Sequence, residues 1–337
     1  MKPCDTEMGP FFQALDFLSP YFSGTFSSWE ASYTPRIEDC FMVLLSFAVG
    51  EPIVSKGDFL LLGNQDLGID KPIFERLLGQ KIIFLRLISR IVIDEKDVEV
   101  AFETINQLGQ LQTVKILGGE PTLYMERLLR VIELARTYGA TNIIVITSGW
   151  WGKRQARAQT IVTSLKQAGL SLLLISVDSF HTQYIPLEHV KGAVQAAADG
   201  GMRYCVLMNL LESIHADNQY DRQTREMIQE LLQLSIPIVP GKVTYLGRAV
   251  ELLSPLYRGE RTLPTRCPLP PFLDSFAEPS GIAIDPLGYV TLCHGIAIGN
   301  MKERPLADIL TEYELEKHPI LNAIMKEGPL GLMKLPH

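Results

Sequence analysis

The turn Gly118-Gly119-Glu120-Pro121 stands out as a segment able to bind a ligand. It follows an apolar, strand-like run, Val114-Lys115-Ile116. Two glycines at the end of a strand let the backbone approach a ligand closely, because no Cβ atom blocks the way. Carbonyl groups exposed there accept hydrogen bonds from an ammonium group. The alternative interpretation is a plain strand-to-helix turn with a proline at the start of the helix.

Small polar residues also follow the later strand-like runs. In parallel α/β folds the carboxyl ends of the strands form the ligand face. These residues are therefore predicted to surround one pocket, although each of them also has an interpretation as a cap. They are Thr147-Ser148-Gly149, Ser176-Val177-Asp178, Asn209 and the segment from Tyr245 to Ala249.

Two further features lie close to the predicted pocket. His181 follows Asp178 and is a candidate acid, base or substrate contact. A hydrogen-bonded structural histidine is the alternative. Trp150 and Trp151, just after Gly149, are interpreted as part of a packed corner between a strand and a helix.

From Asp94 onward, helical and strand patterns alternate, and these elements must position the residues named above. Asp94 itself is a candidate N-cap of the first helix. Five successive strand–helix units predict a parallel sheet with right-handed crossovers. After about residue 250 the pattern stops, and a hairpin with a turn at 285–288 and a short helix are expected. The expected helices are 94–109, 122–138, 153–168, 186–200, 221–233 and 305–310, and the expected strands are 113–117, 142–147, 171–177, 204–209, either 236–239 or 243–246, and the two arms of 281–293.

Composition narrows the class of protein. The chain has 337 residues and a net charge of −7, which argues against a nucleic-acid partner, since that would need a basic face. No apolar run reaches the roughly 18 residues of a membrane span, and the first 20 residues lack a signal-peptide pattern. Five widely spread cysteines do not form a disulfide framework, so a cytoplasmic location is expected. The oligomeric state is not predicted.

The motifs in their order resemble the radical S-adenosylmethionine (SAM) superfamily. The resemblance covers about residues 94–310 and implies a partial (β/α)6 TIM-like barrel over 81–250. It also implies a small SPASM/twitch-like hairpin and helix module over 251–337, after an irregular region, 1–80, of unknown fold. The matching motifs are Gly-Gly-Glu-Pro-x-Leu, Thr-Ser-Gly, Ile-Ser-Val-Asp-Ser-Phe-His, Gly-Arg-Ala, and Asp-Pro-x-Gly-x-Val-x-x-Cys followed by Gly299-Asn300-Met301.

The resemblance also implies cofactors and site residues. Enzymes of this superfamily cleave SAM reductively at a 4Fe–4S cluster to start radical chemistry, here on an unknown small-molecule or peptide substrate. By resemblance, Gly118, Gly119 and Glu120, in one motif with Pro121, hold the methionyl amino group of SAM. The residues implied to face its ribose or carboxylate, together with Ser148 beside them, are Ser176, Asp178 and Asn209.

The chain departs from the family at the cluster. A Cys-x3-Cys-x2-Cys loop normally follows the first strand, and three thiolates from it leave the fourth iron open for SAM. Here the candidate first strand, Ile82–Ile88, leads to the helix at Asp94 without a cysteine, and Cys4 and Cys40 lie far apart. Either the cluster was lost or the N-terminal region is not the ancestral one.

Three functions therefore follow from the sequence. The first is a radical SAM-like enzyme, and the second is a degenerate barrel that binds SAM or a protein partner without catalysis. The third is an ordinary barrel enzyme that uses the glycine turn for a phosphate group. Cys267 and Cys293, with His294, are candidate ligands of an auxiliary metal site or else buried thiols.

Overall fold

The computed structural model describes the backbone of residues 40–46, and residues 93–243, 253–256, 276, 277, 279, 281–293 and 296–335. Internal contacts divide them into two compact units. Unit 1 holds residues 115–243, and unit 2 holds 40–46, 93–114 and the described residues from 253 onward. Strand β2, Gln110–Leu117, crosses this division. The domain boundaries expected from the sequence stay a prediction.

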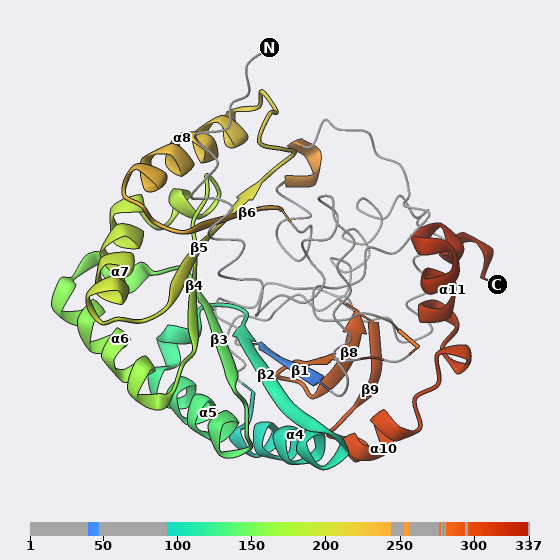
Figure 1. The fold of residues 1–337 in the computed structure, drawn as a ribbon. Helices are drawn as coiled ribbons and strands as arrows, with labels where there is room; N and C mark the ends of the chain where they lie inside the picture. The colour runs from blue at the N-terminus through green and yellow to red at the C-terminus, as the bar shows by residue number, and fades with distance from the viewer. Residues whose placement is uncertain are drawn as a thin grey trace. The chain divides into compact units, whose positions relative to one another are not determined.

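Unit 1 is a run of parallel strands with helices between them. Each strand pairs in parallel with the next along the chain, and Figure 1 shows the helices along the outer side of the strands. This confirms the predicted α/β class and its partial, TIM-like barrel. After the end of β2 the elements are β3 (Asn142–Thr147), β4 (Leu172–Ser176), β5 (Tyr204–Leu210) and β6 (Ile238–Lys242), with α5 (Met125–Thr137), α6 (Gln155–Ala168), α7 (Leu187–Asp199) and α8 (Gln219–Gln233).

The strands of unit 1 are apolar because both faces of the sheet are covered. On one face, Ile144, Leu172, Leu174 and Cys205 form a buried cluster. The alternate residues point to the helices, and Val145, Leu173, Ile175 and Val206 among them have no exposed surface. Near-continuous runs of branched residues were therefore a reliable signal for β3 and β4.

Most predicted boundaries agree with the structure to within a few residues. Helix α4, Glu95–Leu108, begins after Asp94, whose Oδ1 accepts a hydrogen bond from the Lys96 amide at 2.9 Å. The expected helix over 122–138 is two elements, the 3-10 turn η2 (Pro121–Tyr124) and α5. Strand β6, Ile238–Lys242, overlaps the first of the two ranges considered for the last strand and ends before the second.

A corner of unit 1 is packed through two glycines. The 3-10 turn η3, Trp150–Lys153, lies directly on α7. A Cβ atom on Gly152 would lie 1.9 Å from the His189 carbonyl oxygen, and one on Gly192 would lie 2.2 Å from the Gly152 carbonyl oxygen. Trp151 fills the corner and is 1% exposed, which confirms its predicted packing role.

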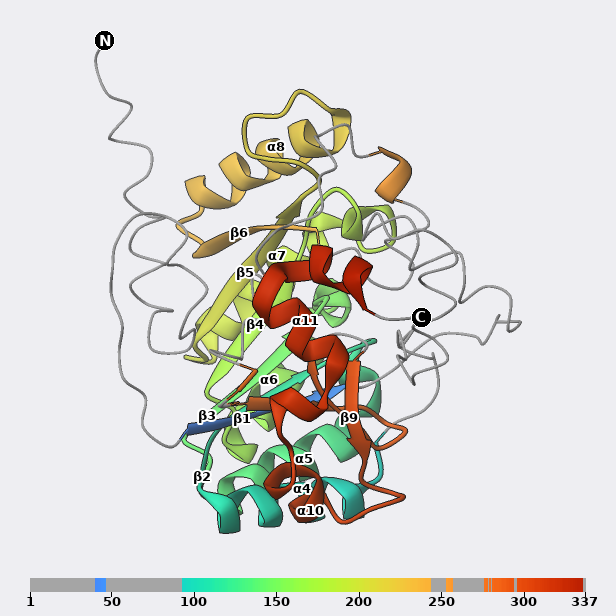
Figure 2. The ribbon, with the colours of Figure 1, turned by 90° about the vertical axis from the view of Figure 1, so that its right-hand side faces the viewer.

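Unit 2 contains the predicted hairpin and several elements that the sequence did not indicate. Strands β7 (Gly281–Ile284) and β8 (Tyr289–Cys293) are antiparallel, joined by the expected turn, in which the Gly288 amide donates to the Asp285 carbonyl oxygen at 3.0 Å. Helix α10 (Leu306–Thr311) matches the expected short helix and contacts α4 (Figure 2). The remaining elements are β9 (Ile296–Asn300), α11 (Pro319–Glu327), η5 (Ser254–Leu256), η6 (Leu315–Lys317) and η7 (Gly328–Lys334).

One strand lies in the region for which the sequence predicts no regular structure. Strand β1, Cys40–Ser46, pairs in parallel with β7 in the register Met42 to Gly281. Its pairing partner is about 240 residues away in the sequence, so no local pattern could reveal it. The candidate strand Ile82–Ile88 lies outside the described residues. Within the described ranges, every helix is too short or too polar to cross a lipid bilayer.

We expect Gly152→Ala to destabilise unit 1 by about 3 kcal/mol, at the upper end of overpacking costs. The added methyl group meets backbone atoms of α7, which cannot move aside as a side-chain end does. Urea denaturation of the full chain measures this change. Lys153→Ala, an exposed neighbour in the same turn, is the control and should change stability by less than about 0.5 kcal/mol. Equal effects would show that the glycine contact is not needed.

Candidate ligand-binding site

Four of the predicted site residues lie at the carboxyl ends of neighbouring strands. Gly118 follows β2, Ser148 follows β3, Ser176 ends β4, and Asn209 is the last residue but one of β5. These strands are adjacent in the order β5, β4, β3, β2. Since the strands are parallel, their carboxyl ends lie along one edge, as the sequence analysis predicts.

The Glu120 carboxylate joins the end of β2 to the end of β3. Its Oε1 accepts hydrogen bonds from the Thr122 amide at 3.2 Å and from the hydroxyls of Thr122 and Thr147, each at 2.6 Å. Its Oε2 accepts from the Ser148 amide at 2.8 Å and from the Ser148 hydroxyl. Five donors thus surround one carboxylate, and Thr122 and Thr147 are themselves buried.

Trp150 covers the Glu120 network from the next loop. Its indole Nε1 donates to the Thr122 hydroxyl oxygen at 3.0 Å. The guanidinium of Arg157, on α6, lies over the Trp150 ring, 4.3 Å from the ring centroid. This cation–π contact gives Arg157 a structural partner within unit 1.

The glycine turn has the conformation for which its residues are suited. Gly118 has φ 98° and Gly119 has φ 49°, both in the left-handed region that side chains disfavour. Gly119 is exposed and Gly118 is partly exposed. The backbone of the turn is therefore accessible, while the Glu120 side chain is held inward by the hydrogen bonds of its own unit.

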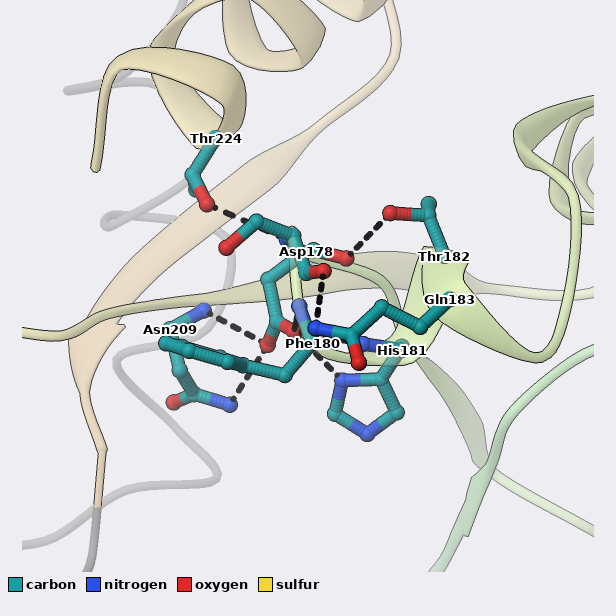
Figure 3. Close-up of polar contacts among 8 residues, drawn as sticks. Asp178, Phe180, His181, Thr182, Gln183, Asn209 and Thr224 are labelled. Carbon is teal, nitrogen blue, oxygen red and sulfur yellow. Dashed lines mark hydrogen bonds and ion pairs between the residues drawn. The ribbon is translucent and has the colours of Figure 1, made fainter. Parts of the chain in front are cut away.

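A second carboxylate, that of Asp178, joins the loop after β4 to the end of β5. Its Oδ1 accepts from the amides of Phe180 and His181, each at 3.0 Å, and contacts His181 Nδ1 at 2.7 Å. Its Oδ2 accepts from the amide and the side-chain Nδ2 of Asn209, each at 3.2 Å. Asp178 also has five partners and no exposed surface (Figure 3).

The loop that carries His181 is fixed on several sides. The Thr224 hydroxyl of α8 accepts from the Ser179 amide at 3.2 Å, and the Thr182 hydroxyl donates to the Asp178 carbonyl oxygen at 3.0 Å (Figure 3). The Phe180 ring stacks on Tyr220 with centroids 5.2 Å apart. The 3-10 turn η4, His181–Gln183, is thereby held at the strand end.

The Asp178–His181 pair has opposite effects on the two pKa values. Burial acts to raise the pKa of Asp178, but the hydrogen bond and the charge of His181 outweigh it, so that the pKa lies below its ordinary value. Burial likewise acts to lower the pKa of His181. The hydrogen bond to Asp178 and its charge, together with the charge of Glu120, hold that pKa above its ordinary value.

The two carboxylates have roles that sequence reasoning did not predict. Glu120 and Asp178 were implied to touch SAM, yet each is occupied by five donors from the chain. Direct contact with a ligand through these side chains stays a prediction. Ser176 and Asn209 are partly exposed at the same edge, and Pro121 is buried under the turn.

Two residues near the edge were not singled out by the sequence analysis. The buried carboxylate of Asp221 accepts hydrogen bonds from the amides of Leu211, Glu212 and Ser213 and so shapes the loop after β5. Lys115 interrupts the apolar run of β2, and burial lowers its pKa to about 8. The lysine in an apolar strand was a signal available in the sequence.

Cys205, the described cysteine of unit 1, does not fit an iron–sulfur cluster. Cluster iron is bound by thiolates, whereas the Cys205 thiol is buried in the core, donates to the Pro237 carbonyl oxygen at 3.3 Å, and has a pKa raised by burial to about 12. Cys293 belongs to the other unit. Cys267 and His294 lie outside the described residues. Among the residues that the structure does describe, no three His, Cys, Asp or Glu side chains gather as a metal site would require.

Comparisons with known proteins find similar solved structures but no matching sequence family. No family model and no curated protein matches the chain. Similar solved structures include BtrN in complex with AdoMet and 2-DOIA, with 14% identity over 87% of this chain and 89% of that one and a TM-score of 0.44. Histidine-tagged anSMEcpe with bound AdoMet has 10% identity over 80% of this chain and 77% of that one and a TM-score of 0.42.

A third similar structure is coproporphyrinogen III oxidase (HemN) from Escherichia coli, described as a radical SAM enzyme. It has 10% identity over 63% of this chain and 46% of that chain, with a TM-score of 0.38. At such identities the ligand and the activity of this chain have to be inferred from its own side chains.

We expect Glu120→Gln to lower the free energy of unfolding by about 1–3 kcal/mol. An amide nitrogen cannot accept hydrogen bonds, so the donors on one oxygen position, either Ser148 or the two threonines, lose their acceptor. Glu133→Gln, an exposed change on α5, is the matched control and should be nearly neutral. A stability for Glu120→Gln equal to that of the control would show that the carboxylate does not hold the strand ends.

The Asp178–His181 pair should stabilise the fold within a window of pH. The raised pKa of His181 contributes stability that is complete below about pH 6.5, its ordinary pKa, and is lost as the pH rises through the folded-state value. The lowered pKa of Asp178 contributes stability that is lost only as the pH falls through its own folded-state value, below 3.8. Wild type should therefore lose stability relative to His181→Asn as the pH rises above about 6.5. A constant difference in denaturation midpoints from about pH 6 to 9 would contradict this.

Proposed function

We propose that the carboxyl edge of β2 to β5 binds S-adenosylmethionine and that the chain is a radical SAM-like protein. One observation carries this proposal: an accessible glycine turn lies on the same edge as two fixed carboxylates and the partly exposed Ser176 and Asn209. SAM carries an ammonium group, a sulfonium centre, a carboxylate and ribose hydroxyls. The edge offers backbone carbonyl oxygens and nearby carboxylate charge for the cationic groups, and neutral polar groups for the rest.

The glycine turn is suited to the ammonium group. Backbone carbonyls at Gly118 and Gly119 can approach a ligand without steric hindrance from a side chain. The Glu120 carboxylate stands directly behind the turn, and its charge favours a cation there even though its lone pairs are occupied by five donors. Glu120 would thus act on the ammonium group through its field and through the position of the turn.

The ends of β4 and β5 are suited to the ribose. Ser176 is partly exposed at the end of β4, one strand away from Asn209. The Asn209 side chain donates its Nδ2 to Asp178, which leaves Oδ1 as a hydrogen-bond acceptor of fixed orientation. A hydroxyl and a carbonyl oxygen on neighbouring strand ends complement vicinal hydroxyls, which both donate and accept.

Radical chemistry would require a 4Fe–4S cluster, which supplies the electron that cleaves SAM. The cysteines that the structure describes do not provide the thiolates for it, so these residues give SAM no source of that electron. A barrel that binds SAM without cleaving it is the second candidate function, and the lack of a Cys-x3-Cys-x2-Cys loop in the sequence before Asp94 favours it. The substrate, expected to be a small molecule or a peptide, and the cytoplasmic location belong to the proposal as well.

Anaerobic reconstitution with iron and sulfide, combined with SAM titration calorimetry, separates these functions. The enzyme would be supported by bound SAM and about four irons per chain. The electron paramagnetic resonance signal of the reduced cluster should then change when SAM is added. Bound SAM without iron would support the non-catalytic barrel. Adenosine 5′-monophosphate serves as the probe for the phosphate alternative, and its binding in the absence of SAM binding would overturn the proposal.

We expect Ser176→Ala to weaken SAM binding by about 2–10-fold, the loss of one neutral hydrogen bond. Thr163→Ala, an exposed change on α6, should leave the affinity unchanged. Titration calorimetry of the full chain measures both. An unaltered affinity in Ser176→Ala would remove the end of β4 from the proposed site.

A further inference from the structure

His181 has one ring nitrogen bound to Asp178 and the other without a hydrogen bond among the described residues. Nδ1 is 2.7 Å from the Asp178 carboxylate, which has no exposed surface, whereas the His181 side chain is 38% exposed. Nε2, at the opposite end of the ring, makes no hydrogen bond with a residue that the structure describes (Figure 3). A buried carboxylate on Nδ1 fixes the tautomer, so that the titrating proton of this pair is the one on Nε2.

The pair is built to stay in this orientation. Asp178 cannot turn away, because its Oδ2 is held by the Asn209 amide and side chain and its Oδ1 by two loop amides. The His181 backbone amide is one of these donors, so the same carboxylate positions both the main chain and the ring.

Two negative charges act on the His181 ring among the described residues. One is Asp178, in the loop after β4, and the other is Glu120, in the turn after β2. Both favour the imidazolium form. Glu120 is also the residue behind the glycine turn, so the ring lies within electrostatic reach of the proposed ammonium position.

We infer that His181 is the proton-carrying residue of the ligand site, and that a cationic ligand at the glycine turn is bound with release of the Nε2 proton. This inference rests on the proposed function. The step breaks the Nε2–H bond, leaves the electron pair on Nε2 and passes the proton to water or to a basic group of the ligand or substrate. The neutral imidazole then presents a lone pair, as a base for a substrate bound next to SAM requires.

The direction in which SAM affinity changes with pH follows from the charges of the ligand and the ring. A ligand with a sulfonium and an ammonium group repels the imidazolium and lowers its proton affinity, so ligand and proton compete. SAM affinity should therefore rise with pH through the titration of His181, by at most about tenfold per pH unit for one linked proton. Below that range His181 is protonated, and above it His181 no longer contributes to the pH dependence of the SAM affinity.

Calorimetric titration of the full chain with SAM in buffers of different ionisation enthalpy counts the protons released. The decisive comparison is wild type with His181→Asn, whose amide nitrogen can replace Nδ1 as the donor to Asp178 but does not titrate. The SAM amino group has a pKa of roughly 8, like other α-amino groups. Its protons contribute equally to the counts for wild type and His181→Asn, so they cancel in the difference. His215→Asn, a change of an exposed histidine in the loop after β5, is the control.

The expected result is a larger proton release in wild type and His215→Asn than in His181→Asn, by up to one proton per SAM between about pH 6.5 and 8. Asp178→Asn should move this release to lower pH. SAM binding with identical proton counts in wild type and His181→Asn would overturn the inference and leave the proposed function standing. No SAM binding by any variant across this range would overturn the proposed function, and the inference with it.

Discussion

Two carboxylates, each with five hydrogen-bond partners, organise the edge of the sheet. Glu120 connects the ends of β2 and β3, and Asp178 connects the ends of β4 and β5. A charge removed from water costs several kcal/mol unless donors replace its hydration. Each carboxylate therefore requires its loops to adopt one arrangement, and that arrangement brings the glycine turn, Ser176 and His181 to the same edge.

The same constraint separates the residues that hold the loops from the groups that can touch a ligand. The side chains that the family resemblance implies as ligand contacts, Glu120 and Asp178, are hydrogen-bonded to the loops that they hold. The backbone of the glycine turn and part of the His181 side chain are exposed. Negative charge is thus placed just behind groups that can touch a ligand. This arrangement attracts a cation electrostatically without exposing flexible acidic side chains to it.

Local patterns were sufficient to predict most of the strands and helices, but not the hydrogen bonds that join the ends of the strands. The apolar runs of β3 and β4 and the Asp94 cap are properties of neighbouring residues, and all three were predicted. Glu120 meets Thr147 and Ser148, 27 and 28 residues away, and Asp178 meets Asn209, 31 residues away. Such partners follow from strand order and register. Strand β1 was missed for the same reason, since its partner β7 is remote in the sequence.

A structure of the chain crystallised with SAM tests the central claim most directly. The account predicts SAM along the carboxyl edge of β2 to β5, with its ammonium group on the backbone carbonyls at Gly118 and Gly119. Glu120 should still accept from Thr147 and Ser148, and Asp178 from His181 and Asn209. SAM bound elsewhere, or a Glu120 carboxylate that leaves β3 to bind the ammonium group itself, would contradict the claim that these carboxylates support the site rather than contact the ligand.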